Sequence, residues 1–293
     1  MTGSIDVAAL LDWASGRRDD LPWRHTRDPW AVLVSELMLQ QTQVSRVIPR
    51  WHQFLDRFPT VSACADAGVG AVVEEWAGLG YNRRAVNLHR CALVIVDEHD
   101  GTIPDDLDKL LALPGLGPYT SRAVLAFAFE RDVAVVDTNV GRVLARQVGR
   151  RLTAKIAQAV ADDAVPVGSG WSWNQAMLDL GAIVCTKRSP NCAVCPVSTT
   201  CAWTSTGRPE PDPAIGSAGV SKGQSSFEGS FRQGRSRLLD VLRTGVDVAP
   251  ERLQESCGWS DRVDGAIDAQ RAAESLVRDG LAIERIDGSL SLP

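Results

Sequence analysis

The sequence predicts a mainly α-helical protein, and three observations support this fold class. Apolar residues recur at helical spacing along most of the first 205 residues. Alternation of apolar and polar residues, which indicates strands, is almost absent from the same part of the chain. Short breaks rich in Gly and Pro separate the helical segments. The predicted helices cover residues 29–58, 62–78, 83–99, 105–113, 120–129 and 139–148.

The boundaries of these helices have local signals. Asp28-Pro29 places a proline at the first helical position, where its missing N–H costs nothing. Gly78-Leu79-Gly80 separates the second helix from the third. The run Leu113-Pro114-Gly115-Leu116-Gly117-Pro118 predicts a tight turn between two later helices.

The composition changes after residue 204. Residues 204–229 are rich in Gly, Ser and Pro, which predicts a flexible or irregular linker. Residues 230–293 predict three short helices and a terminal hairpin with Asp287-Gly288 as its turn, a small α+β segment that is winged-helix-like. The predicted domains are residues 1–205, a linker over 206–229 and a C-terminal domain over 230–293, and the length of 293 residues allows two cores.

Composition bounds the class of protein. No apolar run approaches the roughly 20 residues that span a bilayer. Residues 1–12 contain no basic residue and so do not resemble a signal peptide. Both facts predict a cytoplasmic protein without a membrane partner, and we expect a monomer. The net charge of −5 argues mildly against a nucleic-acid partner, although DNA responds to local charge rather than to the total.

Four of the seven cysteines are clustered: Cys185, Cys192, Cys195 and Cys201 lie within 17 residues, with gaps of six, two and five. Four thiolates at this spacing can surround one metal centre, which is either zinc or an iron–sulfur cluster. Zinc ribbons more often show two Cys-x-x-Cys pairs, so the wider gaps here favour a [4Fe-4S] cluster. Unbound thiols are the remaining alternative.

Other residues near the cysteines have two interpretations. Lys187 and Arg188 lie between the first two cysteines, where they either meet a phosphate or form a solvated basic pair. Cys64 and Cys91 stand in apolar helical contexts and are expected to be core residues.

The turn around Gly115 and Gly117 is typical of a helix–hairpin–helix motif. Its glycines let backbone N–H groups approach a phosphate at the start of the next helix, without a basic side chain. The alternative is an ordinary turn between two helices.

Two carboxylates are candidates for catalysis. Asp137 follows an apolar run and precedes a helix, so it is either a helix cap or a buried functional carboxylate. Glu36 has apolar helical neighbours, and loss of hydration favours its protonated form, as a general acid needs. Glu36 could instead pair with a buried arginine. The run Gln40-Gln41-Thr42-Gln43 either reaches base edges or is a solvated helix end.

Together these strings resemble the helix–hairpin–helix DNA glycosylases, specifically the MutY-type adenine DNA glycosylases, over roughly residues 20–205. The resemblance rests on Pro22-Trp23-Arg24, Ser35-Glu36-Leu37-Met38-Leu39-Gln40-Gln41-Thr42-Gln43, Gly78-Leu79-Gly80-Tyr81, the hairpin turn, Val136-Asp137-Thr138-Asn139, Asn174-Gln175-Ala176-Met177 and the four cysteines. It implies a two-lobed fold with a [4Fe-4S] loop. It also implies an enzyme that removes adenine paired with 8-oxoguanine from double-stranded DNA.

The resemblance also implies roles for individual residues. Glu36 would protonate the adenine N7, Asp137 would stabilise the oxocarbenium ion, and Asn139 would orient Asp137. Gln41 and Tyr81 would enter the base stack around the flipped nucleotide. The residues that would form the adenine pocket are Trp23, Arg24, Leu39 and Gln175.

The residue at position 119 bears on the reaction type. In the related endonuclease III pattern, a Lys two residues after the second glycine of the hairpin forms a Schiff base with the sugar. This chain has Tyr119 there, which would pack near the two carboxylates, so we predict a monofunctional glycosylase.

The chain departs from the family pattern at three places. Asn82 stands where a second aromatic residue is common, and Gly141 where a basic residue is common. Residues 230–293 are too short for the nucleotide-hydrolase-like domain of typical members and contain no Phe-Ser-His-like loop. They are similar to the shortened C-termini of some actinobacterial members. This shortening suggests looser selectivity for the base opposite adenine.

Three other functions remain open. A thymine or uracil glycosylase for T·G or U·G mismatches would share Tyr119, Asp137 and the cluster. Glu36 argues against it, because N7 protonation is useful for a purine. A non-catalytic DNA-binding module would not need two carboxylates. The third alternative is a structural zinc protein, which analysis of the bound metal would distinguish from the other functions.

Overall fold

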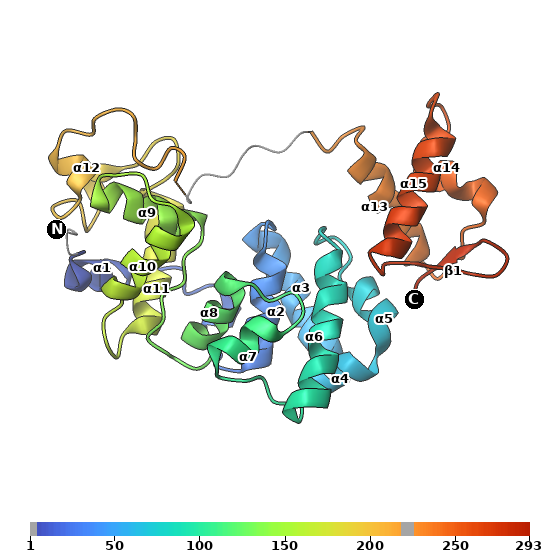
Figure 1. Ribbon diagram of the computed structural model, residues 1–293, viewed down its shortest axis with the longest axis horizontal. Helices are drawn as coiled ribbons and strands as arrows, with labels where there is room; N and C mark the ends of the chain where they lie inside the picture. Colours follow the sequence, from blue (N-terminus) through green and yellow to red (C-terminus); the bar gives the residue numbers. More distant parts are fainter. Residues whose placement is uncertain (1–4, 218–225) are drawn as a thin grey trace. The chain divides into compact units, whose positions relative to one another are not determined.

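The computed structural model describes residues 5–217 and 226–293 (Figure 1). Within these ranges the chain is mainly helical, as predicted, and its strands are confined to one short hairpin. None of the helices described is long and apolar enough to cross a membrane.

The α-helices are α1 (Val7–Ala14), α2 (Pro29–Leu39), α3 (Val44–Arg57), α4 (Val61–Asp66), α5 (Gly68–Glu75), α6 (Arg83–His99), α7 (Leu107–Ala112), α8 (Pro118–Phe127), α9 (Thr138–Val148), α10 (Ala154–Ala164), α11 (Gly170–Asp179), α12 (Ala202–Ser205), α13 (Phe231–Leu242), α14 (Leu253–Ser256) and α15 (Gly265–Arg278). The other short elements are the 3-10 turns η1 (Pro22–Arg24), η3 (Cys192–Val194) and η4 (Pro250–Arg252), the π-helix η2 (Leu180–Val184), and the antiparallel strands β1 (Ile283–Glu284) and β2 (Leu290–Ser291).

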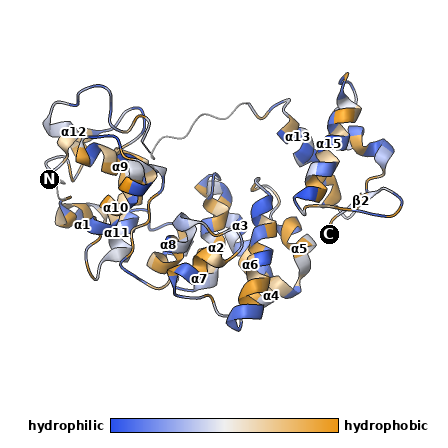
Figure 2. Ribbon diagram, viewed as in Figure 1, coloured by the Kyte–Doolittle hydropathy of each residue, from blue (hydrophilic) through white to orange (hydrophobic). Residues whose placement is uncertain are grey.

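The chain forms two compact units, each assembled from segments that are distant in the sequence. The first unit contains Met1–Val32, Asp105–Leu111 and Leu116–Gly223. The second contains Leu33–Pro104, Ala112–Gly115 and Gln224–Pro293. In both units helices carry hydrophobic and hydrophilic residues side by side, as Figure 2 shows, because each helix buries one face and exposes another.

The first unit is built around α9 and α11. Helix α1 packs against α11, and α9 packs against α10, α11, α12 and η2. Their shared core contains Leu10, Leu144, Trp173 and Met177, all fully buried. The π-helix η2 continues α11 and ends directly before Cys185, so the core helix leads into the cysteine-rich loop. A π-turn inside a helix often marks a functional position.

The second unit contains α3 to α6 and the C-terminal elements. Helices α4 and α5 pack against α6, and α13 and α14 pack against α15. Cys64 and Cys91 are fully buried, as predicted, and burial raises the pKa of each thiol to about 12. These two cysteines are therefore core residues.

Most predicted elements are present, but two of the predicted helices are each divided in two. The predicted helix over 62–78 is α4 and α5, because Gly68 adopts a left-handed backbone conformation with φ 79°. The predicted helix over 29–58 is two helices, because Gln41 adopts a left-handed backbone conformation with φ 57° and ends the first of them. The C-terminal segment has the predicted three helices and a hairpin that turns at Asp287-Gly288. Helices α1, α10 and α11 had not been predicted.

The predicted linker over 206–229 includes residues 218–225, which lie outside the described residues. Residues 209–217, here called the strap, are irregular but make specific hydrogen bonds to other parts of the first unit. The Gly216 carbonyl accepts from Arg151 Nε, and the Ser217 hydroxyl accepts from the Leu152 N–H at 3.0 Å. The strap is therefore held against the end of α9.

Candidate active site and cysteine cavity

Asp137 is a helix cap, one of the two alternatives that its sequence context allowed, and its side chain is half-buried. It caps α9, and its Oδ1 accepts hydrogen bonds from the N–H groups of Asn139 at 2.8 Å and Val140 at 2.7 Å. Its Oδ2 accepts from the Asn139 side-chain amide at 2.8 Å. Burial raises the pKa of Asp137 above its ordinary value, although these hydrogen bonds oppose the rise. The site therefore holds a fixed, partly desolvated carboxylate.

Asn174 fixes the segment that leads to Asp137, a role that the sequence did not reveal. Its Oδ1 accepts from the Val135 N–H at 2.8 Å, and its Nδ2 donates to the Val133 carbonyl at 2.8 Å. Nδ2 also donates to the Gly170 carbonyl within α11. The segment 133–136 forms no strand, so this fully buried amide satisfies backbone groups that a sheet would otherwise pair.

A chain of hydrogen bonds connects Asp137 with the first clustered cysteine. The Asn139 Oδ1 accepts from Arg142 Nη2 at 2.9 Å, and Arg142 Nε donates to the Cys185 carbonyl at 2.7 Å. Gly181 makes this connection possible, because a Cβ there would lie 2.6 Å from the Cβ of Asn139. The start of α9 and η2 therefore approach more closely than any other residue at position 181 would permit.

The four clustered cysteines line one cavity, together with Arg146 and Trp203. Cys195 shows how close the thiols are: burial and then the nearby Cys185, Cys201 and Cys192 raise its pKa to about 11. No group of three or more His, Cys, Asp or Glu side chains in the described ranges is already arranged around a single metal ion. Lys187 and Arg188 are exposed between the first two cysteines.

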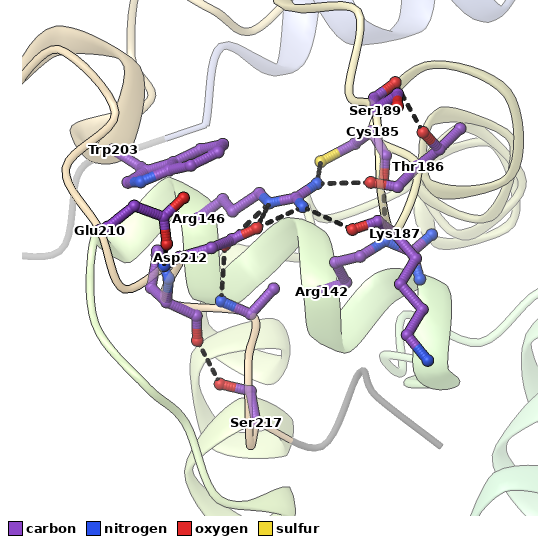
Figure 3. Close-up of polar contacts among 12 residues, drawn as sticks. Arg142, Arg146, Cys185, Thr186, Lys187, Ser189, Trp203, Glu210, Asp212 and Ser217 are labelled. Carbon is purple, nitrogen blue, oxygen red and sulfur yellow. Dashed lines mark hydrogen bonds and ion pairs between the residues drawn. The ribbon is translucent and has the colours of Figure 1, made fainter. Parts of the chain in front are cut away.

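Arg146 organises this region from α9 (Figure 3). Its Nη1 donates to the Cys185 Sγ at 3.3 Å and to the Thr186 carbonyl at 2.8 Å. Its Nη2 pairs with Asp212 of the strap at 2.6 Å, and its guanidinium lies 5.0 Å from the centre of the Trp203 ring. Burial works to lower the pKa of Arg146, but Asp212 and Cys185 raise it.

These contacts suit an anionic metal centre. Four thiols converge on one cavity, and a buried guanidinium donates to the sulfur of one of them. Such a donor stabilises a thiolate, which is the form that ligates iron or zinc. The donor set therefore fits the predicted cluster.

The predicted adenine-pocket residues of the first unit lie in and beside a cleft of about 390 Å³. Arg24 and Gln175 line this cleft, whereas Trp23 is buried in η1. Arg24 forms a two-point ion pair with the buried Asp179, with Nη1 and Nη2 at 3.0 and 2.8 Å from its carboxylate oxygens. This pair ties η1 to the end of α11.

Glu36 belongs to the second unit and lies on α2. Its side chain is buried, with 6% exposed, among the apolar residues that the sequence indicated. Leu39, at the end of the same helix, is half-buried. The structure thus confirms the apolar environment from which the general-acid role was predicted.

Gln41 and Tyr81 lie in two loops, residues 40–43 and 78–82, here called the wedge loops. Both residues have positive φ, at 57° and 47°, and both line the same cleft. Tyr81 is 44% exposed. A left-handed backbone at a residue other than glycine costs about 1–2 kcal/mol and is often found at functional positions.

Arg84, which the sequence analysis missed, holds the wedge loops together. From the first turn of α6 it donates to carbonyls on both sides: Leu37, Met38, Gln40, Leu79, Gly80 and Tyr81. It also donates to the Thr42 hydroxyl at 3.0 Å. Burial lowers the pKa of Arg84 to about 10, so it remains a cation at neutral pH. Because acceptors from both wedge loops bind this one guanidinium, both strained loops keep their shape.

The predicted hairpin turn connects α7 and α8. Gly115 has φ 81°, and a Cβ there would lie 2.6 Å from the Cβ of Asn87. Gly117 precedes the first turn of α8, and a Cβ there would meet nothing within 4 Å. The open space beside Gly117 leaves the helix start accessible to a ligand. Tyr119 is half-buried and packs against an apolar cluster that includes Val32 and Phe127.

Several known proteins have sequences similar to this chain. Residues 34–160 match the model of the HhH-GPD superfamily of base excision DNA repair proteins. The chain is 42% identical to the adenine DNA glycosylase of Mycolicibacterium smegmatis, over 99% of this chain and 96% of that protein. It is 40% identical to that of Mycobacterium tuberculosis, over 99% and 94%. The human adenine DNA glycosylase is 38% identical over 66% of this chain and 38% of its own length.

Solved structures show the same fold. A thermostable thymine-DNA glycosylase matches with a TM-score of 0.65 and 30% identity, over 68% of this chain and 94% of that one. An endonuclease III in a non-covalent DNA complex matches with a TM-score of 0.60 and 21% identity over the same shares. The fold and the sequence define a helix–hairpin–helix base excision repair protein. Within that superfamily, the chain belongs to the MutY-type adenine DNA glycosylases.

Proposed function

We propose that this enzyme removes adenine paired with 8-oxoguanine or guanine from double-stranded DNA, by hydrolysis of the N-glycosidic bond after base flipping. The observation that carries the proposal is the state of Asp137: a partly desolvated carboxylate held in one orientation by three hydrogen bonds at the start of α9. A fixed negative charge of this kind stabilises a cation that develops during reaction. Full-length similarity to adenine DNA glycosylases supports adenine as the base.

In this proposal Glu36 and Asp137 have separate tasks. Glu36 donates a proton to N7 of the flipped adenine, so that the base leaves as a neutral molecule. Asp137 remains ionised and stabilises the oxocarbenium ion until water attacks the sugar. Asn139 keeps the carboxylate of Asp137 in place through its side-chain amide. Trp23, Arg24, Leu39 and Gln175 enclose the base, and Gln41 and Tyr81 fill the gap in the duplex.

Strand cleavage through a Schiff base is not expected. Position 119 carries a phenol rather than an amine, and Tyr119 packs into an apolar cluster. The enzyme therefore leaves an intact strand with an abasic site. The Gly117 end of the hairpin binds a phosphate next to this site through backbone N–H groups.

Cys185, Cys192, Cys195 and Cys201 would hold a [4Fe-4S] cluster in this proposal. When bound, the cluster supplies bonds that fix the loop 185–201 in its folded form. The thiolates, Arg142 and Arg146 then connect this loop to α9, which carries Asp137. Lys187 and Arg188 present positive charge to DNA from the same loop.

The proposal includes the domain organisation, oligomeric state and cellular location of the enzyme. Residues 230–293 act as a winged-helix-like domain joined by the linker over 206–229 to a glycosylase domain over 1–205. The enzyme acts as a monomer in the cytoplasm, where its DNA substrate lies.

End-labelled duplexes containing one A·8-oxoguanine, A·G, T·G or U·G pair test the proposal. We expect strand breaks only after hot alkali and only at adenine. Glu36→Gln should abolish them, whereas Glu98→Gln, the same change at an exposed position of α6, should not. Cleavage at thymine or uracil would assign the chain to mismatch repair of pyrimidines. Breaks without alkali would contradict the monofunctional mechanism. Equal excision from A·8-oxoguanine and A·G would support the looser opposite-base selectivity.

A further inference from the structure

The wedge loops and the C-terminal helix α13 line a common cleft of about 590 Å³ in the second unit. One side is formed by both wedge loops and the first turn of α3, and the other by α13 and Phe227. Its charged lining residues, among those that the structure describes, are four arginines and one aspartate: Arg46, Arg232, Arg235, Arg243 and Asp240. The cleft is thus strongly basic in a protein whose net charge is −5.

Arg243 fixes α13 beside the wedge loop that carries Tyr81. Its Nη2 donates to the Asn82 Oδ1 at 2.9 Å, and its Nε donates to the Val73 carbonyl at 3.0 Å. Asn82 is the residue at which the chain departs from the family pattern of two aromatic residues. Asn82 therefore has a structural role, because its side-chain oxygen accepts the hydrogen bond that holds α13 in place.

The arginines of the cleft have different partners. Arg243 pairs with Asp240 at 2.7 Å, and Arg235 pairs with Asp279, the residue that directly follows α15. Arg46 is exposed and forms no ion pair with any carboxylate in the ranges 5–217 and 226–293. Arg232 is also exposed; it lies 5.9 Å from the centre of the Phe227 ring and donates to the Ser226 carbonyl. The side chains of Arg46 and Arg232 are thus both exposed, one on each side of the cleft.

We propose that this cleft binds the phosphodiester backbone of a DNA strand next to the wedge loops, with Arg46 and Arg232 each contacting a phosphate. The proposal rests on the proposed function, which brings duplex DNA to Gln41 and Tyr81. Exposed guanidinium groups bind phosphates with two parallel hydrogen bonds, and each contact releases counterions from the DNA. The C-terminal segment thus acts as half of a DNA clamp.

The test measures the dissociation constant of the full-length protein for a labelled duplex at several salt concentrations. Arg46→Gln and Arg232→Gln should each lower the slope of log K against log salt by about 0.9, and the double variant by about 1.8. Affinity at low salt should fall about 3- to 10-fold for each change. Arg237→Gln removes an exposed charge from α13 outside the cleft and should leave the slope unchanged.

Three results would overturn the proposal. The first is a double variant with the slope of the wild type, and the second is an equal loss in Arg237→Gln, which would indicate a general charge effect. The third is calorimetric binding of inorganic phosphate in the cleft with an unchanged DNA slope, which would assign the cleft to a free anion. Adenine excision is measured separately. A protein with the expected slopes but no excision would contradict the proposed function and leave the clamp intact.

Discussion

Two regions of this protein use a buried arginine to hold loops in place, and they balance its charge differently. On α9, Arg146 pairs with Asp212 and donates to the sulfur of Cys185. At the wedge loops, Arg84 donates to six backbone carbonyls and one hydroxyl. The α9 region is built from opposite charges that compensate each other, whereas the wedge loops are held by a cation bonded to neutral dipoles.

The difference fits the proposed task of each region. On α9, Arg146 is paired with Asp212, whereas Asp137 forms no direct ion pair among the described residues, and hydrogen bonds from its neighbours set its orientation. Neutral acceptors at Arg84 leave positive charge beside loops that are proposed to enter DNA. Four substitutions, ordered from the largest expected effect to the smallest, test this comparison.

Asp137→Asn should lower the rate of adenine excision by about 10³-fold, because an amide cannot balance the positive sugar. It should also raise the Tm at neutral pH. The raised pKa of Asp137 means that its ionisation opposes folding, so the wild type loses stability as the pH rises through that pKa. The variant avoids this loss and keeps an oxygen to cap α9, although it gives up the hydrogen bond from the Asn139 side-chain amide.

The Tm advantage of Asp137→Asn should therefore disappear as the pH falls below the ordinary Asp value of 3.8. Asp163→Asn, at an exposed position of α10, is the control and should change neither rate nor Tm. A variant that excises adenine normally would remove Asp137 from the mechanism.

Arg84→Met should destabilise the protein by about 3–5 kcal/mol, because several buried acceptors lose their donor at once. Urea unfolding gives the value, and Arg90→Met, an exposed position on the same helix, is the control. A loss below about 1 kcal/mol would mean that water replaces the guanidinium, and the wedge loops would not depend on Arg84.

Asp212→Asn should destabilise the protein by about 2 kcal/mol, since Arg146 keeps its carbonyl partners but loses its charged one. Burial works to raise the pKa of Asp212, but Arg146 holds it below the ordinary value. The stability from this pair is therefore present above pH 3.8 and is lost as the pH falls through the lowered pKa. Wild type and variant should converge in acid, and a difference that persisted there would contradict the ion-pair interpretation.

Thr42→Val should cost about 1 kcal/mol, the smallest of these effects. The Thr42 hydroxyl accepts from Arg84 at 3.0 Å and donates to the Leu79 carbonyl at 3.1 Å, so it joins the two wedge loops. Hydrogen exchange should increase in residues 40–43 and 78–82 and not in the strap. Thr102→Val, at an exposed position, serves as the matched control.

The sequence predicted elements wherever local signals were strong. Helix α6 begins and ends where expected, because the Gly78-Leu79-Gly80 break precedes an uninterrupted helical pattern. The break at Gln41 was missed, since apolar periodicity continues through both α2 and α3. Helix α11 was missed because its buried residues include Asn174 and Asp179, which are polar but satisfied by partners.

The candidate site residues also divide into those that have a local sequence signal and those that do not. Glu36 and Asp137 were identified because each is a carboxylate in an apolar context, which a sequence displays directly. Arg84 and Arg146 were not identified, because their partners are backbone carbonyls and a residue 66 positions away. Such partners depend on the tertiary fold, and side-chain chemistry along the sequence does not reveal them.

The packing of α1 against α11 sets an order for folding during synthesis. Helix α1 is made well before its partner, which begins at Gly170. At ribosomal rates of about 5–20 residues per second, α1 waits roughly 10–30 s for that partner. The second unit begins to form in the interval, although its last segment follows the strap. The nascent chain therefore exposes the apolar face of α1 throughout this interval.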